Sequence, residues 1–592
     1  MRATGFVFLT VLCGLDPLVA AADVDVVVVG AGIGGLTTAL RASEQGLRVG
    51  VVDMASVFGG HAVMSSGGLS IVGTPLQKEK GIEDSPRLAY QDFLRQGQDA
   101  NEPMVKLYVE RSKELIYDWL TGLGVKFTGV SSGGIGKTGN SAYRFHTNPK
   151  LGYGLVAPIY RECLRKGVEF HWNFQVTGLE TKAGRVVGVK GTNLRTAKAA
   201  ALTGQAVVLA TGGYESNIEL VRKHWPKHLG EAPPKVMLGS GVNSNGSGLA
   251  LAESVGGALT KMDHQWIYSR GMPDPAHMAE GRGLYVTIPG AIWLNAGGKR
   301  FVNEMSATVE SIRAVVSQPG GTYWMLFDEA AANAVFVVGP DWQDRKKVRA
   351  EVVDNAVIVK TAATLEEAAR SAGLPPDAVA ASVKLWNEAV ASGTDSAFAR
   401  PMSSPPGPRG AFRLSKIETG PYHLMQIYPL TRKSMGGIAV DLEGRVLSQA
   451  GRPVAGLYAV GETTGEGGIN GRAALEGTFL GPAIVQGHMA AAHLAASVKP
   501  AARAAAQTAR GAGDEAGKGL SAECTQCHAM ARLTARKRPG YWHFEKLHTV
   551  VAGRGTECKA CHAEMAPYRA GAHRIDRVAQ IDTCVACHLV RE

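Results

Sequence analysis

The stretch Val26–Gly35, VVVVGAGIGG, decides the fold. Four consecutive β-branched residues predict a strand buried on both faces, as in parallel sheets. The strand ends in a Gly-x-Gly-x-x-Gly pattern at Gly30, Gly32 and Gly35, and a helical stretch and a second apolar strand ending at Asp53 follow. In this β-α-β context the glycines let a pyrophosphate approach the helix N-terminus, and the Asp53 carboxylate can bind a ribose hydroxyl. The motif predicts a dinucleotide site, for FAD or NAD.

The buried-strand pattern returns twice further along the chain. Residues 206–210 precede Thr211-Gly212, and residues 457–460 precede Gly461-Glu462. Between them, residues 262–425 mix helical and strand patterns without dinucleotide signals. We therefore expect an α/β fold, with a Rossmann-like domain in two parts, residues 23–261 and 426–495, interrupted by an inserted α+β capping domain at 262–425. An amphipathic helix is expected from Met104 to Leu123.

The two ends of the chain have different compositions. Residues 1–22 combine a basic start, an apolar run and small residues before position 22, which predicts a cleaved signal peptide and export to the periplasm. Asp16 and Pro17 leave the apolar run too short for a membrane span. Residues 496–520, rich in Ala, Gly, Lys and Arg, predict a linker. Residues 521–592 have too few apolar side chains for a conventional core, so this domain needs covalent staples or cofactors.

Six of the eight cysteines lie in three copies of Cys-x-x-Cys-His near the C-terminus. One Cys-x-x-Cys alone could be a redox pair or half of a zinc site. The direct His after each copy predicts c-type haem, because two thiols add to the porphyrin vinyl groups and the His ligates the iron. The predicted attachment thiols are Cys524, Cys527, Cys558, Cys561, Cys584 and Cys587, and the predicted proximal ligands are His528, His562 and His588.

This segment contains three further histidines, one for each predicted haem iron: His543, His548 and His573. We expect them to be the distal ligands, which makes electron-transfer centres, and the pairing stays open. Met530 and Met565 are the competing axial candidates.

The chain carries a formal net charge of +11, but its basic residues are not clustered with aromatic ones. A short basic run stands at 536–538. A solvated basic surface therefore explains the charge, and no nucleic-acid partner is expected.

Four motifs stand in a family order: Gly59-Gly60-His61 to Gly67-Gly68, LATGGY at 209–214, NAGGKRFVNE at 295–304, and GLYAVGE at 456–462. Over residues 24–495 the chain resembles the fumarate reductase and succinate dehydrogenase flavoprotein superfamily. The resemblance implies FAD, a mobile cap, and a substrate held between the cap and the isoalloxazine. It also implies that Glu462 contacts the ribityl or ribose part. The expected FAD-binding residues are Gly30, Gly32, Gly35, Asp53, Gly60, His61, Gly67, Gly68, Thr211, Gly212 and Glu462.

His61 falls where membrane-bound succinate dehydrogenases carry the histidine that is covalently joined to FAD. Two alternatives stay open at this position. The histidine either forms that covalent bond, which would raise the flavin potential, or hydrogen-bonds the flavin or its phosphates.

The residues that bind fumarate in this superfamily are largely replaced. Thr308 stands at the position of the proton-delivering Arg, and Tyr268 stands near that of a carboxylate-binding His. The superfamily carries a Thr-Glu pair upstream of the asparagine strand, and residues 281–284 stand there in this chain. A second His of the superfamily is replaced by Arg432 or Lys433. Arg472 falls near the second carboxylate-binding Arg. The candidate catalytic residues are Tyr268, Arg282, Arg432 and Arg472, with Tyr285, Tyr422 and Tyr428 as further lining candidates.

Three functions remain open from the sequence. The first is reduction of an activated C=C bond, on a substrate other than fumarate, with electrons relayed through three haems from a periplasmic or membrane-associated, quinol-linked cytochrome. The second is dehydrogenation of a saturated substrate with the electron flow reversed. The third is a non-catalytic electron carrier.

Overall fold

The computed structural model describes residues 23–131, 140–306, 308–339, 342–403, 413–473 and 475–500, together with Ala531. The predicted signal peptide, the linker beyond residue 500, and the haem motifs with their histidines lie outside the described residues. In the part of the chain that is described, no helix is both long and apolar enough to cross a membrane.

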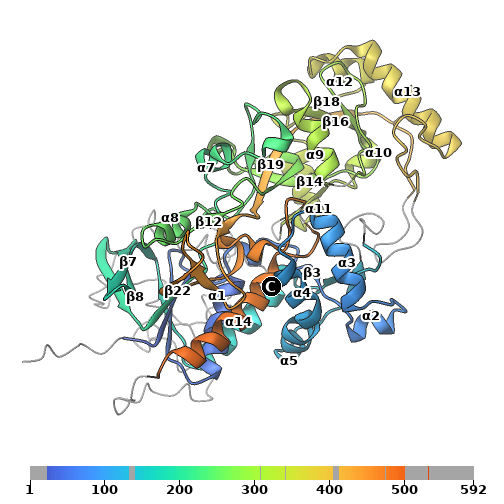
Figure 1. Cartoon of the computed structure of the whole chain (residues 1–592). Coiled ribbons are helices and arrows are strands. Elements are labelled where there is room, and N and C mark those ends of the chain that lie inside the picture. The colour runs from blue at the N-terminus through green and yellow to red at the C-terminus, as the bar shows by residue number, and fades with distance from the viewer. Residues whose placement is uncertain are drawn as a thin grey trace, which may run out of the picture.

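The lower part of the molecule in Figure 1 is built on one six-stranded sheet, in the order β21-β22-β10-β1-β2-β6. Its strands are β1 (Val26–Val29), β2 (Val49–Asp53), β6 (Glu169–Trp172), β10 (Ala206–Leu209), β21 (Arg445–Leu447) and β22 (Pro453–Ala459). All neighbours are parallel except β21 and β22. The four valines of β1 are almost completely buried, as their β-branched run predicts.

Different elements cover the two faces of this sheet. Helices α1 (Ile33–Glu44), α6 (Leu151–Arg165) and α14 (Leu480–Ser497) share one apolar core with one face of the strands. A three-stranded antiparallel sheet covers the other, and comprises β7 (Phe174–Lys182), β8 (Arg185–Asn193) and β9 (Lys198–Thr203). Alternate residues of β1 therefore point into two separate cores, which is the expected pattern of a parallel strand.

A mostly helical segment packs beside α14. It contains β3 (Leu69–Ser70), α2 (Pro75–Glu79), α3 (Pro86–Gly97), α4 (Glu102–Ser112), a π-helical turn (Lys113–Asp118), α5 (Trp119–Gly122), β4 (Gly129–Ser131) and β5 (Phe145–Thr147). The predicted helix from Met104 to Leu123 is present as one helical run, and the π-helical turn lies in its middle.

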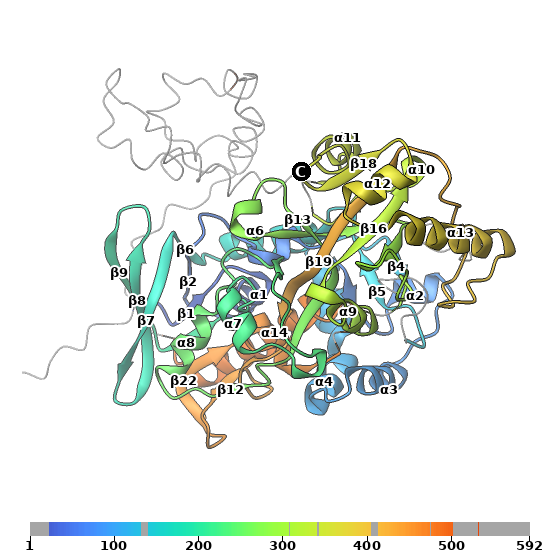
Figure 2. The ribbon, with the colours of Figure 1, turned by 90° about the horizontal axis from the view of Figure 1, so that it is seen from above.

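The upper part is an inserted α+β unit around an eight-stranded sheet in the order β15-β16-β19-β13-β14-β17, with β11 and β18 also paired to β19. Its strands are β11 (Met237–Leu238), β13 (Gln265–Pro273), β14 (Gly283–Thr287), β15 (Ile292–Leu294), β16 (Tyr323–Asp328), β17 (Phe336–Val337), β18 (Val359–Ala362) and β19 (Tyr422–Ser434). Figure 2 shows the long strand β19 running through this unit, and it crosses the predicted boundary at residue 425.

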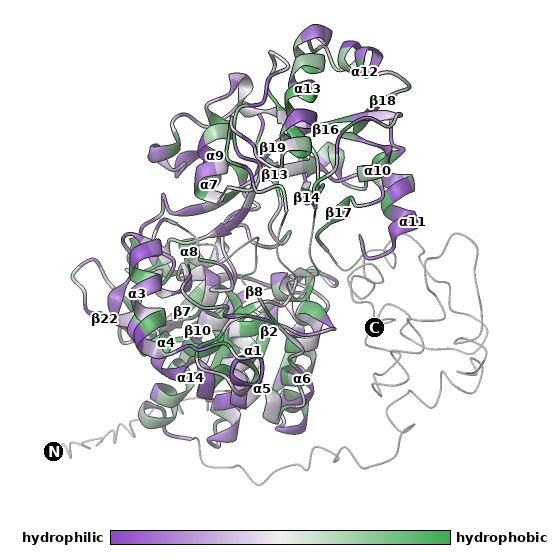
Figure 3. Cartoon of the chain, turned by 90° about the vertical axis from the view of Figure 1, so that its right-hand side faces the viewer, coloured by the Kyte–Doolittle hydropathy of each residue, from purple (hydrophilic) through white to green (hydrophobic). Residues whose placement is uncertain are grey.

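Helices pack around the cap sheet. They are α9 (Thr308–Val316), α10 (Glu329–Ala332), α11 (Arg345–Val348), α12 (Leu365–Ser371) and α13 (Pro376–Ser392). The connection between the two parts carries α7 (Ile218–Lys223), α8 (Ser247–Glu253) and the small pair β12 (Leu259–Thr260) and β20 (Gly437–Ile438). Figure 3 shows the cap stacked on the parallel-sheet part. β13 and β19 lie in the cap sheet, and β19 ends just before the segments that lead back to β22.

Candidate active site

The turn between β1 and α1 has the geometry that a dinucleotide requires. Gly30 has φ +110°, and a Cβ there would lie 2.3 Å from the Ala210 carbonyl oxygen. A Cβ at Gly35 would lie 2.0 Å from the Gly30 oxygen, so neither position accepts a side chain. Gly32 differs, because it has an ordinary φ of −73° and a Cβ there would meet nothing within 4 Å. Open space therefore lies against the N-terminus of α1, where a pyrophosphate would bind.

Asp53 lies at the C-terminal end of β2, beside this turn. Its carboxylate accepts hydrogen bonds from the backbone N–H groups of Ala31 and Ala55, each at 2.7 Å. Burial raises the pKa of Asp53, and the two N–H groups act against that rise. The bonds orient the carboxylate next to Ala31, as binding of a ribose hydroxyl requires.

His61 lies over the same turn, because Gly59 forms a β-bridge with Gly32. Its Nδ1 is 3.4 Å from the Ser240 hydroxyl and 3.8 Å from a Glu462 carboxylate oxygen. Its Nε2 is buried and has no partner among the described residues. Burial, helped by the charge of Lys433, lowers the pKa of His61 to about 3, so the imidazole is neutral at physiological pH. A neutral ring with one buried, unpaired nitrogen fits a group that faces a bound cofactor.

Glu462 begins the turn after β22. It accepts a hydrogen bond from the Ser434 N–H at 3.2 Å and lies 3.9 Å from Lys433 Nζ. Burial alone would raise the pKa of Glu462, but Lys433 and His61 hold it below its ordinary value. Glu462 is therefore a buried, ionised carboxylate. We call Gly30, Gly32, Gly35, Asp53, His61 and Glu462 the cofactor cradle.

The remaining predicted FAD-binding residues have mainly packing contacts. A Cβ at Gly67 would lie 2.4 Å from the Leu151 carbonyl carbon, and one at Gly68 would lie 1.7 Å from the Phe145 ring. Gly60 lies against Gly32, with its Cβ position 3.5 Å from the Gly32 Cα. Thr211 bonds the Thr463 hydroxyl at 3.1 Å, and Gly212 has φ +76°. These residues bring segments close together around the cradle.

Two buried acids beside the cradle were not predicted from the sequence. Both carboxylate oxygens of Glu215 lack a partner among the described residues, and burial together with Glu462 raises its pKa well above the ordinary value. Glu466 has φ +56°, and burial with Glu462 likewise raises its pKa. Such orphaned polar groups need partners that a bound molecule can supply, so the site fits FAD. The glycines that flank Glu466 are the one sequence signal that marks it.

Four rings form an aromatic wall made of Trp266, Tyr268, Tyr285 and Phe479. Tyr268 lies 5.0 Å from Trp266 and 4.7 Å from Tyr285 between ring centroids, and Trp266 stacks on Phe479 at 4.8 Å. Lys433 joins this wall to the cofactor cradle, because its Nζ lies 5.0 Å over the Phe479 ring and 3.9 Å from Glu462. The wall therefore borders the cradle.

Two of the predicted arginines lie close to this wall. Arg432, on β19, donates to the Gly239 carbonyl at 2.6 Å, and Arg282 donates to the Ser240 carbonyl. Burial raises the pKa of Tyr268, Glu476 raises it further, and the Arg432 guanidinium acts against the rise through its charge and a hydrogen bond. The structure thus brings together Tyr268, Arg432 and Arg282.

Arg472 lies at a more open position. Its side chain is 44% exposed and pairs with Asp99 at 3.3 Å. Asp99 also contacts His264 at 3.3 Å and Lys261 at 3.8 Å. We call these four residues the rim cluster. Thr308, at the position of the superfamily's proton-delivering Arg, begins α9.

The other candidate tyrosines separate. Tyr422 lies at the start of β19 and packs against the core of α12 and α13. Tyr428 accepts Lys235 over its ring at 4.2 Å. Neither ring contacts the aromatic wall in the described residues.

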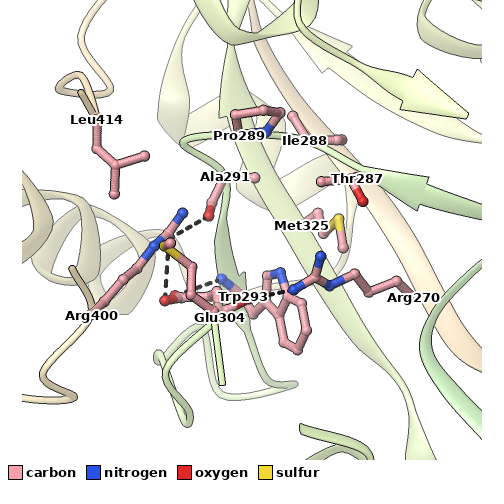
Figure 4. Close-up of a pocket in the computed structure, with 11 residues that line it drawn as sticks. Arg270, Thr287, Ile288, Pro289, Ala291, Trp293, Glu304, Met325, Arg400 and Leu414 are labelled. Atoms are coloured by element: carbon pink, nitrogen blue, oxygen red, sulfur yellow. Dashed lines mark hydrogen bonds and ion pairs between the residues drawn. The ribbon is translucent and has the colours of Figure 1, made fainter. Parts of the chain in front are cut away.

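A further hollow lies inside the cap (Figure 4). Arg270 and Arg400 approach it from opposite sides, and apolar groups such as Met325 form much of its lining. Arg270 donates to the Glu304 carbonyl at 2.6 Å and reaches the Tyr285 hydroxyl at 3.4 Å. All its lining residues belong to the cap, so it is separate from the cradle.

Comparison with known proteins agrees with this geometry. The FAD binding domain family matches residues 25–480. A fumarate reductase (cytochrome) of Shewanella frigidimarina is 30% identical over 480 residues, which cover 79% of this chain and 76% of the relative. A KsdD-like steroid dehydrogenase of Mycobacterium tuberculosis is 31% identical over 538 residues, covering 79% of this chain and 94% of the relative. The chain belongs to the FAD binding domain family.

The solved structures include the open conformation of a flavocytochrome c3 fumarate reductase, with a TM-score of 0.65 and 26% identity over 80% of this chain and 78% of that one. The predicted mixed α/β flavoprotein fold is confirmed. The protein is an FAD-dependent oxidoreductase of the fumarate reductase and ketosteroid dehydrogenase group, whose members act on CH–CH bonds.

Proposed function

We propose that this protein is an exported flavocytochrome c that reduces an activated C=C bond of a substrate larger and less charged than fumarate. Electrons reach the FAD through three c-type haems held by residues 521–592. The aromatic wall beside the cradle is the observation that carries the substrate part of this proposal. A small dicarboxylate needs several cationic or hydroxyl partners, whereas stacked rings favour a flat apolar substrate.

Different residues of the chain bind the substrate and transfer the proton in the proposed reaction. When bound, the flavin supplies hydride transfer to or from carbon. In this proposal Tyr268 gives a proton to the neighbouring carbon of the substrate, and the Arg432 guanidinium, whose charge lowers the pKa of Tyr268, stabilises the resulting phenolate. Trp266 and Phe479 hold the substrate against the cradle and exclude water.

The haem part of the proposal rests on the three Cys-x-x-Cys-His copies. The predicted signal peptide supports a periplasmic location for these haems. The electron donor in that location is a periplasmic or membrane-associated, quinol-linked cytochrome.

Purified, fully matured protein tests both parts. A pyridine haemochromogen assay should find three haems per FAD. A screen with a reduced dye as donor should show turnover of cyclic enones and little of fumarate. Fumarate turnover faster than that of every enone would contradict the substrate class, and protein without a Soret band would contradict the relay.

Dehydrogenation of a saturated substrate, with electrons leaving through the haems, is the second candidate. The KsdD-like steroid dehydrogenase relative favours it, because 94% of that relative aligns with this chain. A saturated cyclic ketone or ketosteroid with ferricyanide as acceptor tests this direction. Turnover there, with none from the reduced dye, would replace the first candidate.

The covalent alternative at His61 belongs to the same proposal. The neutral ring with its unpaired Nε2 supports either a covalent bond or a hydrogen bond to FAD. Flavin fluorescence that stays with the protein band on a denaturing gel would establish the bond, and release of free FAD would exclude it.

A further inference from the structure

The hollow inside the cap combines two cationic groups with an apolar wall (Figure 4). Its volume is about 140 Å³. The guanidinium groups of Arg270 and Arg400 approach it from opposite sides. The apolar part of its lining includes Ile288, Pro289, Ala291, Met325 and Leu414. Because a cavity of similar size holds benzene in another protein, the hollow has room for a small ring or a short alkyl chain.

Arg400 is a buried cation with one unused hydrogen-bond donor. Its side chain is 3% exposed, and its guanidinium lies 4.7 Å over the Trp386 ring. Its Nη1 donates to the Ala291 carbonyl at 2.8 Å and lies 3.2 Å from a Glu304 carboxylate oxygen. Its Nε has no partner among the described residues. Since a buried donor without a partner costs stability, a ligand in the hollow that accepts this hydrogen bond would be stabilised.

Arg270, on β13, brings a second guanidinium to the hollow. Its Nη2 donates to the Glu304 backbone carbonyl at 2.6 Å, and its Nη1 lies 3.4 Å from the Tyr285 hydroxyl. The guanidinium also lies 5.2 Å over the Trp293 ring. None of these partners in the described part of the chain is a carboxylate. Because Arg400 contacts the side chain of the same Glu304, one residue holds both guanidiniums at the hollow.

The charges around the hollow do not balance. Both Glu304 carboxylate oxygens accept hydrogen bonds from Arg300 at 2.8 Å, and Arg300 also pairs with Asp395 at 2.8 Å. The cluster further contains Arg270 and Arg400, so within the described residues three guanidiniums share two carboxylates. One positive charge is therefore unmatched, and a single negative charge in the hollow would balance it, whereas a dianion would leave an excess of negative charge.

We propose that the cap hollow is a binding site for a small organic monocarboxylate, with its carboxylate between Arg270 and Arg400 and its apolar body against the apolar lining. Planar guanidinium groups match the geometry of a carboxylate and form strong, charge-assisted hydrogen bonds with it. The apolar lining selects against inorganic anions, which have no apolar surface to bury. This site is separate from the cofactor cradle, and it does not depend on the substrate class of the proposed function.

Isothermal titration calorimetry on the full-length, FAD- and haem-loaded protein tests the ligand class. Benzoate should bind with a Kd on the order of 1 mM or lower. Benzamide, which has a similar shape but no charge, should bind at least about tenfold more weakly. Acetate, which has the charge but no sizeable apolar body, should also bind at least about tenfold more weakly. No detectable binding of benzoate, or equal affinity for benzamide, would overturn the proposal.

Variants of the two arginines test the location. Arg270→Gln removes one cation, so the affinity for benzoate should fall at least about tenfold. Arg400→Lys keeps the charge but removes the Nε–H and the planar group, and it should also weaken binding. Arg370→Gln is the matched control, because Arg370 lies in an exposed ion pair on α12, and it should leave the affinity unchanged. Thermal unfolding shows whether each variant is folded, and if Arg400→Lys is not, Arg270→Gln decides.

The flavin absorption spectrum separates the hollow from the substrate site. A ligand that lies over the isoalloxazine changes its surroundings and shifts its absorption bands, whereas benzoate in the cap hollow should leave the bands unchanged. Benzoate binding that shifts the flavin bands, or that keeps its affinity in both arginine variants, would place the ligand elsewhere and overturn the proposal. Neither measurement needs turnover, so failure of the proposed substrate class would leave this test intact.

Discussion

The cofactor cradle and the aromatic wall are built from different kinds of group. The cradle depends on backbone geometry, since Gly30 and Gly35 allow contacts that no side chain would permit and Gly32 leaves space at a helix N-terminus. The wall depends on side chains, with Trp266 and Tyr268 from β13 meeting Phe479 from the segment before α14. Every dinucleotide presents the same pyrophosphate to the backbone that binds it, whereas the side chains of a substrate wall differ with the substrate.

The largest difference is expected between the effects of substitutions at two glycines of the cradle, Gly35 and Gly32. Gly35→Ala places a Cβ 2.0 Å from the Gly30 oxygen, so we expect destabilisation of about 3 kcal/mol or more and little folded protein. Gly32→Ala meets no protein atom within 4 Å, so the fold should survive, while FAD affinity falls at least about tenfold.

Thermal unfolding and flavin-to-protein ratio measure these effects. Gly122→Ala, which also meets nothing within 4 Å but lies in α5, is the matched control and should change neither. Full FAD occupancy in Gly32→Ala would show that the pyrophosphate does not bind against Gly32.

The next largest effect concerns the wall. Tyr268→Phe removes the hydroxyl that faces Arg432, so we expect kcat to fall roughly 10²–10⁴-fold with FAD content unchanged. Tyr422→Phe, in the α12–α13 core, should leave kcat near the wild-type value. Steady-state assays with the same donor dye decide this, and equal rates for both variants would remove Tyr268 from the reaction.

The two arginines predicted to bind substrate should differ. Arg432→Gln should lower kcat/KM at least about a hundredfold, because its guanidinium supports Tyr268. Arg472→Gln should cost less than about fivefold, since an exposed ion pair is worth only about 0–1 kcal/mol. A larger loss of kcat/KM in Arg472→Gln, measured on the same substrate, would show that the rim cluster forms part of the substrate site.

The smallest effect is a change in acid stability. The pKa of His61 is lowered from 6.5 to about 3, so above pH 6.5 the folded and unfolded states both hold a neutral ring. Between those values only the unfolded state binds the proton, and stability is lost as pH falls, by up to about 1.4 kcal/mol per pH unit. His61→Gln should show a shallower loss in denaturant titrations over this range. An identical slope would mean that His61 is protonated in the folded state.

Much of the fold was predictable from the sequence. The run at 26–29, the glycine pattern and Asp53 each carry a local signal, and the structure places them as expected. The π-helical turn at Lys113–Asp118 was not predictable, because apolar periodicity does not distinguish it from an α-helix.

The site was predictable only in part. Tyr268, Arg282 and Arg432 lie near one another, and Arg472 lies in the rim cluster; the catalytic roles of all four stay predictions. Glu215 carries no motif. Its importance comes from two buried carboxylate oxygens that have no partner among the described residues, a property that exists only after residues far apart in the chain have packed together.

We propose that the haems of the C-terminal segment and the FAD of the cradle form one electron path to the substrate. Anaerobic stopped-flow absorbance on the fully reduced protein measures electron flow along this path. After addition of 2-cyclohexenone, the flavin should reoxidise first, and the haems, followed through their Soret and α bands, should then reoxidise at the turnover rate. Haems that stay reduced while the flavin turns over would rule out the shared path.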